Sequence, residues 1–272
     1  MVEQLYHNPD IYRIYVPLPD NPLKYLNCYV LISDGETLII DTGFNRPECK
    51  QALFDGLDEL QVDFAHTKLF LTHLHGDHSG LTEELTARGV PVFMNAIDYD
   101  YLCQELASGG WQAMEQIFLS EGFPMEEIEK QKKGNQARLY SPHHPFPASK
   151  VSDNDLLTVG GITLRCIHTP GHTPGHTCLY IEDKEILFSG DHILFDITPN
   201  ISVWRNIPYS LADYLESLQK IKGLKVSHTF PGHREFHGDI HDRINALALH
   251  HHARLKEILD AIDHHPDCTA YE

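Results

Sequence analysis

One short stretch, Leu69–Leu81 with the sequence LFLTHLHGDHSGL, limits the possible folds and chemistry of this chain more than any other. An apolar run typical of a buried strand leads directly into four side chains that can bind metal: His73, His75, Asp77 and His78. Residues two apart at an extended strand end point to the same side, so His73 and His75 can share one ion. Asp77 and His78 follow where a helix begins and can reach a second ion. Imidazole and carboxylate without thiolate suit zinc, iron or manganese.

The overall composition indicates a folded globular chain. With 272 residues the chain can bury a large core in a single domain. Its net charge of −18 argues against binding nucleic acid or an anionic membrane through the overall field, although a local basic groove stays open. No apolar run approaches the roughly 20 residues of a membrane-spanning helix.

The cellular compartment follows from the N-terminus and the cysteines. The first residues, MVEQLYHNPDIY, are polar and acidic where a secretion signal would be basic and then apolar. The cysteines are scattered without close pairing, so we expect buried thiols in a reducing cytoplasm and no redox role. They are Cys28, Cys49, Cys103, Cys166, Cys178 and Cys268.

The first third of the chain alternates predicted strands with predicted helices. Three strands are expected between residues 11 and 42, with a hairpin turn at Asp34-Gly35. A helix is predicted at 47–62, a strand at 68–72, a helix at 79–88 closed by Gly89, and a strand at 90–94. Asp41 ends the third strand and could be a metal ligand, a hydrogen-bond partner of a ligand histidine, or a turn cap. We favour the partner role. The alternation indicates an α/β layered architecture.

Residues 96–150 break this alternation and contain no metal motif. Long helical patterns are followed by a loop with prolines and histidines, SPHHPFPASK, in which His143 and His144 are expected to face solvent. We predict a helical insertion that forms a lid over a pocket, because insertions on a rigid scaffold commonly set specificity. A structural appendage or a homodimer surface is the equal alternative.

The second half of the chain repeats the pattern of a strand that ends in a polar side chain. His172 lies in the loop TPGHTPGH after a predicted hairpin, Asp191 follows KEILFSG, and His233 follows VSHTFPG. One carboxylate has two oxygens, so Asp191 could bridge two ions. His168 and His176 are assigned to the core or to contacts with the ligands. Asn200 and Trp204 could line a substrate cleft, but for Trp204 we favour ordinary packing.

The last predicted element is an amphipathic helix at 239–265. His250, His251 and His252 are consecutive on it, so they point in different directions and cannot share one ion. We expect all three at the surface.

Taken together, these residues resemble the metallo-β-lactamase superfamily, and the loop TPGHTPGHT and the FSGD strand resemble its glyoxalase II-like branch. The resemblance covers residues 10–237 and implies an αββα sandwich. It implies that His73, His75 and His172 bind one divalent metal ion. Asp77, His78 and His233 would bind a second ion, and Asp191 would bridge the two. Zinc is the expected metal, with iron or manganese as alternatives. Members often continue into a helical C-terminal module, so the chain is either truncated after residue 265 or lacks this module.

The function implied by this resemblance is metal-dependent hydrolysis of a small-molecule substrate that is an ester, thioester or lactone. The two ions would lower the pKa of a bound water towards ~7 and hold the developing oxyanion. Asp77 or His192 would assist proton transfer. Leu74 and Leu81 depart from the true glyoxalase II pattern, so glutathione thioesters are not the expected substrate. A phosphodiesterase or ribonuclease of the same fold is the first alternative, and an iron-dependent oxidoreductase is the second.

Overall fold

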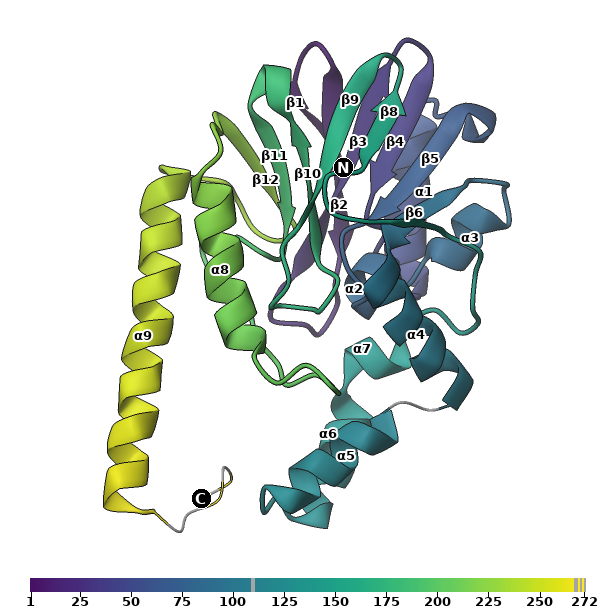
Figure 1. The fold of residues 1–272 in the computed structure, drawn as a ribbon. Coiled ribbons are helices and arrows are strands. Elements are labelled where there is room, and N and C mark those ends of the chain that lie inside the picture. Colours follow the sequence, from purple (N-terminus) through teal and green to yellow (C-terminus); the bar gives the residue numbers. More distant parts are fainter. Residues whose placement is uncertain (109–110, 267–268, 270, 272) are drawn as a thin grey trace.

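The computed structural model describes residues 1–108, 111–266, 269 and 271, and it contains two β-sheets that pack face to face with helices on both outer sides (Figure 1). The seven-stranded sheet has the order β1-β2-β3-β4-β5-β6-β7, and the five-stranded sheet has the order β12-β11-β10-β9-β8. The strands of the first sheet are β1 (Val2–Tyr6), β2 (Asp10–Pro17), β3 (Tyr25–Ser33), β4 (Glu36–Ile40), β5 (Thr67–Leu71), β6 (Val92–Asn95) and β7 (Ser149–Val151). Those of the second are β8 (Leu156–Val159), β9 (Ile162–His168), β10 (Thr177–Ile181), β11 (Ile186–Gly190) and β12 (His228–Pro231).

The predicted hairpin at Asp34-Gly35 is present and sets the register of β3 against β4. Ser33 pairs with Glu36, and both turn residues have positive φ, 44° for Asp34 and 78° for Gly35. Such a two-residue turn with positive φ matches the twist of the strands that it joins. From β4 to β7 the strands run parallel, so their carboxyl ends meet at one edge of the sheet.

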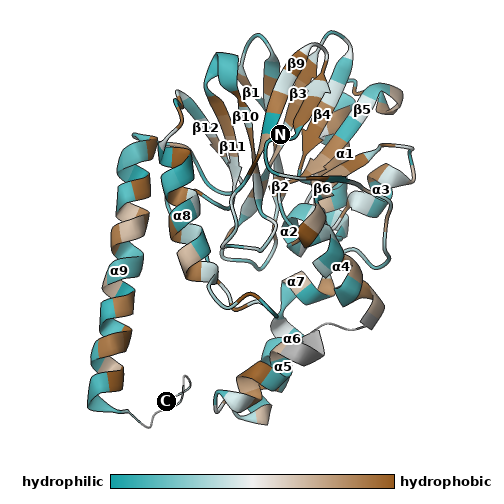
Figure 2. Ribbon diagram, viewed as in Figure 1, coloured by the Kyte–Doolittle hydropathy of each residue, from teal (hydrophilic) through white to brown (hydrophobic). Residues whose placement is uncertain are grey.

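The apolar side chains form three layers that account for the sandwich. Residues of β3 alternate between two of them, since Cys28 and Val30 pack on the helix side while Tyr29 and Leu31 pack between the sheets. Both faces of the central strands are therefore buried, which explains their nearly continuous apolar sequence (Figure 2). The third layer lies between the five-stranded sheet and the last two helices.

The helices cover the two outer faces. The first face is covered by α1 (Pro47–Glu59) and α3 (Thr82–Thr86), and the second by α8 (Ser210–Lys222) and α9 (Ile240–His264). The remaining helices are α2 (Gly76–Ser79), α4 (Ala96–Ser108), α5 (Trp111–Ser120), α6 (Met125–Gly134) and α7 (Gln136–Leu139), with 3₁₀ turns η1 (Phe64–His66) and η2 (Glu182–Lys184). No helix in the described ranges is long and apolar enough to cross a membrane.

Several element predictions need correction. The single helix expected at 79–88 is replaced by α2 and α3, because the backbone leaves the helical conformation at Leu81, with φ −96° and ψ 13°. The edge strands β1 and β7 were missed, since short edge strands carry little apolar periodicity. His251 was expected at the surface but is buried against Tyr214, with ring centroids 5.2 Å apart.

The histidines of the loop after α7 and the cysteines agree more closely with expectation. His143 and His144 are exposed. The described cysteines are free thiols, and all except the half-buried Cys103 are buried. The remaining residue, Cys268, lies outside the described residues.

Candidate metal centre

Seven side chains with metal-binding atoms meet where four strands of the two sheets end. His73, His75, Asp77 and His78 come from the segment after β5 of the first sheet. From the second sheet, His172 follows β9, Asp191 follows β11 and His233 follows β12. They form three groups, in each of which the ligand atoms lie within 4.8 Å of one another. The groups are His73 with His75 and His172; His73 with His78 and Asp191; and Asp77 with His78 and His233.

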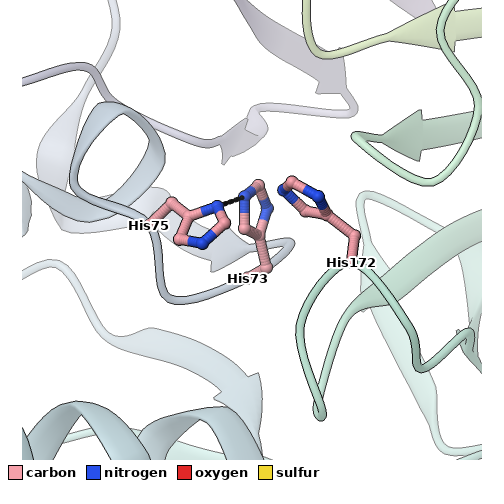
Figure 3. A group of neighbouring side chains, drawn as sticks. All are labelled: His73, His75 and His172. Carbon is pink, nitrogen blue, oxygen red and sulfur yellow. Dashed lines mark hydrogen bonds between the residues drawn. The ribbon is translucent and has the colours of Figure 1, made fainter. Parts of the chain in front are cut away.

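The first group has the geometry of a three-imidazole site (Figure 3). The Nε2 atom of His73 lies 3.1 Å from Nδ1 of His75. The ring centroid of His172 lies 4.9 Å from that of His73 and 4.6 Å from that of His75. Burial, followed by the neighbouring histidines, holds the pKa of His75 at about 3, so this side chain is neutral and has a free lone pair at neutral pH.

The group of Asp77, His78 and His233, called the second group from here on, combines two imidazoles with a carboxylate. Asp77 Oδ2 lies 3.3 Å from Nε2 of His233 and 3.9 Å from Nε2 of His78. Burial alone would raise the pKa of Asp77, but His78 and His233 outweigh it and lower the pKa to about 2. The carboxylate is therefore ionised and available as a ligand.

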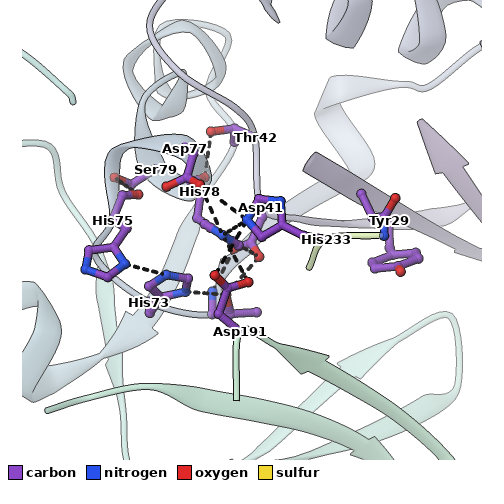
Figure 4. A network of polar contacts seen from close by, with 12 residues as sticks. Tyr29, Asp41, Thr42, His73, His75, Asp77, His78, Ser79, Asp191 and His233 are labelled. Atoms are coloured by element: carbon purple, nitrogen blue, oxygen red, sulfur yellow. Dashed lines mark hydrogen bonds and ion pairs between the residues drawn. The ribbon is translucent and has the colours of Figure 1, made fainter. Parts of the chain in front are cut away.

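Asp191 lies between the two groups (Figure 4). Its Oδ1 is 3.5 Å from His78 Nε2, while its Oδ2 is 3.6 Å from His172 Nε2 and 3.5 Å from His233 Nε2. The side chain thus contacts both groups, which is the position that the sequence predicted for a bridging carboxylate.

The hydrogen bonds on the outer side of the rings fix which nitrogen faces the centre. Nδ1 of His172 donates to the carbonyl of Asn200 at 2.6 Å, and Nδ1 of His233 donates to that of Tyr25 at 2.8 Å. A carbonyl can only accept, so the proton is on Nδ1 and the Nε2 lone pair points inward. Outer contacts of this kind orient ligand histidines in metal sites.

Asp41 orients a third ring in the same way. Its Oδ2 accepts from His78 Nδ1 at 2.7 Å, and its two oxygens accept from the backbone N–H and hydroxyl of Thr72, each at 2.8 Å. This is the hydrogen bond to a ligand histidine that we favoured from the sequence. The backbone of Asp41 has φ 62°, a conformation that costs a non-glycine residue energy and is found preferentially at functional sites.

These contacts fit a bound cation. His78 Nε2 and His233 Nε2 lie 3.3 Å apart, and both carry inward lone pairs once Nδ1 holds the proton. Two lone pairs at that distance repel unless a positive charge lies between them. In addition, His172 Nε2 and Asp191 Oδ1 are buried without a hydrogen-bond partner among the described residues. Buried polar atoms are rarely left unpaired, so the donor set is suited to divalent ions.

The electrostatics of the second group also favour positive charge. Burial alone would lower the pKa of His78 and of His233. Asp41 and Asp191 outweigh that effect at His78, and Asp191 and Asp77 do so at His233, so both pKa values are raised. A site that stabilises protonated imidazole stabilises a metal cation for the same reason.

Close backbone packing supports this arrangement at Gly232. A Cβ atom at this position would lie 2.5 Å from Asp191 Oδ1 and 3.0 Å from His78 Cε1. Only a residue without a side chain lets the loop after β12 approach the carboxylate so closely.

Two further histidines of the second half lie behind the ligands. His176 Nδ1 contacts the Thr169 hydroxyl at 2.8 Å, and its Nε2 accepts from the backbone N–H of Asp191 at 3.1 Å, so it positions Asp191. His192 is fully buried between the rings of His176 and Tyr214. Burial holds its pKa at about 3, and it belongs to none of the ligand groups in the described part of the chain. The geometry therefore gives no support to His192 as a proton-transfer residue.

Sequence reasoning missed Asp98, the buried side chain that connects the two ligand loops. Its Oδ2 accepts from the backbone N–H of Leu74 at 3.0 Å and from the hydroxyl of Thr173 at 2.6 Å. Its Oδ1 accepts from the N–H of Gly175 at 2.5 Å. Leu74 lies between two ligand histidines, and Thr173 follows the third. Asp98 lies in the first turn of α4, where an acidic residue is common in any helix, so the sequence carried no signal for this role.

A cavity of about 540 Å³ opens beside the first ligand group. His75, Asn200 and Trp204 are among its lining residues. The Trp204 indole stacks on the His75 ring at 6.0 Å, and its Nε1 donates to the carbonyl of His172 at 3.3 Å. Trp204 packs against the first apolar layer, as we favoured, and it also contacts two residues of the site and lines the cavity.

With this geometry established, the chain can be compared with known proteins. The family model described as the metallo-beta-lactamase superfamily matches residues 22–233. The chain belongs to the metallo-beta-lactamase superfamily. This confirms the predicted family, and the two sheets with helices outside confirm the predicted fold. A crystal structure of a metallo-beta-lactamase family protein from Thermus thermophilus superposes with a TM-score of 0.83 at 32% identity, covering 93% of this chain and 83% of that one.

The curated relatives bear hydrolase names. An atrochrysone carboxyl ACP thioesterase of Cryptosporiopsis sp. is 26% identical over 266 residues, which is 96% of this chain and 65% of that protein. A beta-lactamase-like protein 2 homolog of Caenorhabditis elegans is 25% identical over 251 residues, or 92% of this chain and 70% of that protein. The chain thus spans about two thirds of the length of these relatives. Their names support the predicted enzyme class.

Proposed function

We propose that this chain is a metal-dependent hydrolase that cleaves thioesters at a centre of two divalent ions. The observation that carries the proposal is the convergence of seven side chains with metal-binding atoms, six of them buried and His75 partly buried, with Asp191 in contact with both groups. The thioesterase names among the relatives favour a thioester over an ester or a lactone.

The ligand assignment follows the three geometric groups. His73, His75 and His172 would hold one ion. Asp77, His78 and His233 would hold the other, with Asp191 shared between them. We propose zinc for both positions, since imidazole and carboxylate ligands suit it. Ions bound there would activate water and polarise the acyl carbonyl.

The reaction needs no nucleophile from the protein. The oxygen of water forms a bond to the acyl carbon, the carbon–sulfur bond breaks, and the sulfur leaves as a thiol once it has gained a proton. Asp77, with a pKa held at about 2, accepts protons poorly, so we assign it the role of a ligand rather than a base. The role of Asp41 is to hold the His78 ring so that its Nε2 points to the centre.

The decisive experiment combines metal analysis with hydrolysis. Elemental analysis of protein purified without added metal should give about two zinc ions per chain. The purified protein should release thiol from a simple acyl-N-acetylcysteamine thioester. Asp191→Ala should lose both metal and activity, because its carboxylate contacts both groups. The matched control is Asp196→Ala, since the Asp196 side chain is half exposed and pairs with His237 instead.

Other results would point elsewhere. Hydrolysis of bis(p-nitrophenyl) phosphate without any thioester hydrolysis would replace the proposal with a phosphodiesterase. One iron per chain, together with inactivity on every acyl substrate, would favour an oxidoreductase. Full metal content and activity in Asp191→Ala would overturn the bridging assignment.

A further inference from the structure

The cavity beside the metal centre is built largely by the insertion between β6 and β7, together with the loop 200–205. It begins at His75 and Leu74, next to the ligand atoms, and extends between α4, α5, α6 and α7. Figure 1 shows these helices grouped beyond the end of the sandwich at which the ligand-bearing strands end. A volume of about 540 Å³ lies within the range of pockets that bind small organic ligands.

The wall farthest from the metal centre is apolar. It is formed by side chains of α5 and α6 and of the turn between them: Met114, Ile117, Phe118, Phe123 and Ile128. Ile128 is only 2% exposed, whereas Phe118 is 36% exposed although it belongs to the same wall. Figure 2 shows brown apolar residues along these helices. Covering such a surface with a hydrocarbon group lowers the free energy, because apolar surface is removed from water.

The charges that line the cavity do not make it an anion site. Glu115 pairs with Lys132 at 2.8 Å and with Arg138 at 3.1 Å, so two of the cations are already neutralised by a carboxylate of the same cavity. Phosphate-binding sites instead present convergent cations and backbone N–H groups to the ligand. The remaining charged residues of the lining are Glu105, Glu121 and Arg205, so carboxylates and cations are equal in number. This balance favours an uncharged occupant.

Trp204 connects the cavity with the candidate metal ligands. Its indole stacks on His75 and hydrogen-bonds to the backbone of His172, so it belongs to both the cavity and the metal centre. Tyr101 of α4 makes an edge contact with the same indole at 5.8 Å and hydrogen-bonds to the backbone carbonyl of Arg205. A group that extends from the ligand atoms into the cavity would lie beside this pair of aromatic rings.

We infer that this cavity binds the apolar acyl group of the substrate and that the insertion sets the acyl length that the enzyme accepts. The inference rests on the proposed thioesterase function. The scissile carbonyl carbon must lie at the ions, so either the acyl side or the thiol side of the substrate can enter beside His75. The thiol arms of carriers are rich in amides, which would lose hydrogen bonds with water against this wall. The hydrocarbon side of the substrate has no hydrogen bonds with water to lose.

The test compares two methionine substitutions in the insertion. Met114→Trp enlarges a side chain that lines the cavity, whereas Met125→Trp makes the same change at a position that is 54% exposed and is not among the lining residues. For the Met114 variant, kcat/KM for the decanoyl-N-acetylcysteamine thioester should fall roughly 10- to 200-fold. The acetyl thioester should be unaffected. The Met125 variant should retain the wild-type ratio of the two substrates.

A binding measurement separates this inference from the proposed function. S-decyl-N-acetylcysteamine, a thioether that cannot be hydrolysed, should bind the wild type in calorimetry and bind Met114→Trp at least tenfold more weakly. If the wild type binds the thioether but hydrolyses no thioester, the proposed function fails and the cavity assignment stands. If it hydrolyses acetyl and decanoyl thioesters equally and Met114→Trp changes neither hydrolysis nor binding, the cavity assignment fails and the proposed function stands.

A second variant with a smaller side chain tests the inference even if Met114→Trp fails to fold. Phe118→Ala removes a partly exposed ring from the apolar wall and creates no steric overlap. It should raise KM for the decanoyl thioester more than it changes kcat, because the ring contributes binding that is equal in the ground state and the transition state. An unchanged KM in this variant, with wild-type circular dichroism, would contradict the inference.

Discussion

Each ligand imidazole whose outer nitrogen meets a carbonyl or carboxylate presents a defined lone pair to the centre. His172 uses the carbonyl of Asn200, His233 uses that of Tyr25, and His78 uses the carboxylate of Asp41. These contacts set the tautomer before any ion binds, so the protein provides orientation as well as ligand atoms. Similar contacts elsewhere change metal affinity by about 10- to 100-fold when they are removed.

Asp98 provides a test of whether ligand loops depend on a residue that touches no ion. Asp98→Ala would leave the buried N–H groups of Leu74 and Gly175 without an acceptor, at a cost of about 1–3 kcal/mol each. The loops that carry His73, His75 and His172 should then lose their fixed separation. We expect metal affinity, measured by competition with a chelator, to fall about 10- to 100-fold.

A substitution on the same helix controls for this prediction. Asp100→Ala removes an exposed carboxylate that pairs with Lys150, and it should leave metal affinity unchanged. Asp98→Asn retains an acceptor oxygen and should recover part of the affinity lost in Asp98→Ala. Equal affinity in the Asp98→Ala and Asp100→Ala proteins would show that the two loops hold their positions without this carboxylate.

Single residues show most clearly which parts of the candidate site could be predicted from the sequence and which could not. The histidines at 73, 75 and 78 could be found because metal ligands directly after a buried strand have a recognisable spacing. Asp98 could not, because its three partners lie 24 to 77 positions away along the chain and nothing local distinguishes it from an ordinary first-turn carboxylate. Long-range hydrogen bonds leave little local trace in a sequence.

Among the elements, α9 is divided into a buried half and an exposed half. Ile240, Ile244 and Leu247 pack with α8 in the third apolar layer. Beyond His251, apolar residues such as Ile258 and Leu259 are 51% and 62% exposed. The amphipathic pattern of the sequence predicted the helix correctly. It did not predict that His251 would complete the contact with Tyr214, because polar residues are expected to face water.

Two isoleucines on this helix make a matched comparison of stability. Ile244 is 0% exposed, so Ile244→Ala should lower the free energy of unfolding by about 2–5 kcal/mol through lost burial and the resulting cavity. Ile258→Ala should change it by no more than about 0.5 kcal/mol. Urea denaturation followed by circular dichroism measures both values. Comparable losses in the two variants would mean that the second half of α9 is packed in solution.

Over the whole molecule, the candidate metal centre depends on both halves of the sandwich. Four of the proposed ligands come from the segment after β5 in the seven-stranded sheet, and three come from loops of the five-stranded sheet. The sequence predicted this convergence because the candidate ligands follow apolar runs and are flanked by glycine or proline. It also predicted a pocket beside the helical insertion, with Asn200 and Trp204 as candidates for its lining, but it did not predict which side chains of the four helices form the walls. The relative positions of those elements depend on packing that no local pattern records.

Because each ion would contact residues of both sheets, metal removal should destabilise the whole fold. A ligand that binds only the folded state at a hundred times its dissociation constant stabilises it by about 2.7 kcal/mol. The melting temperature of the purified protein should therefore fall when a chelator is added and recover when zinc is restored in excess.

The Asp191→Ala protein supplies the control for that experiment, since its shared carboxylate is the side chain that contacts both ligand groups. Its melting temperature should lie close to that of the chelated wild type and should not respond to zinc at concentrations that restore the wild type. A wild-type melting temperature that is unchanged by a chelator, after elemental analysis has shown the ions to be gone, would mean that the two sheets are held together by the apolar layer between them alone. In that case the ions would serve chemistry and contribute nothing to stability.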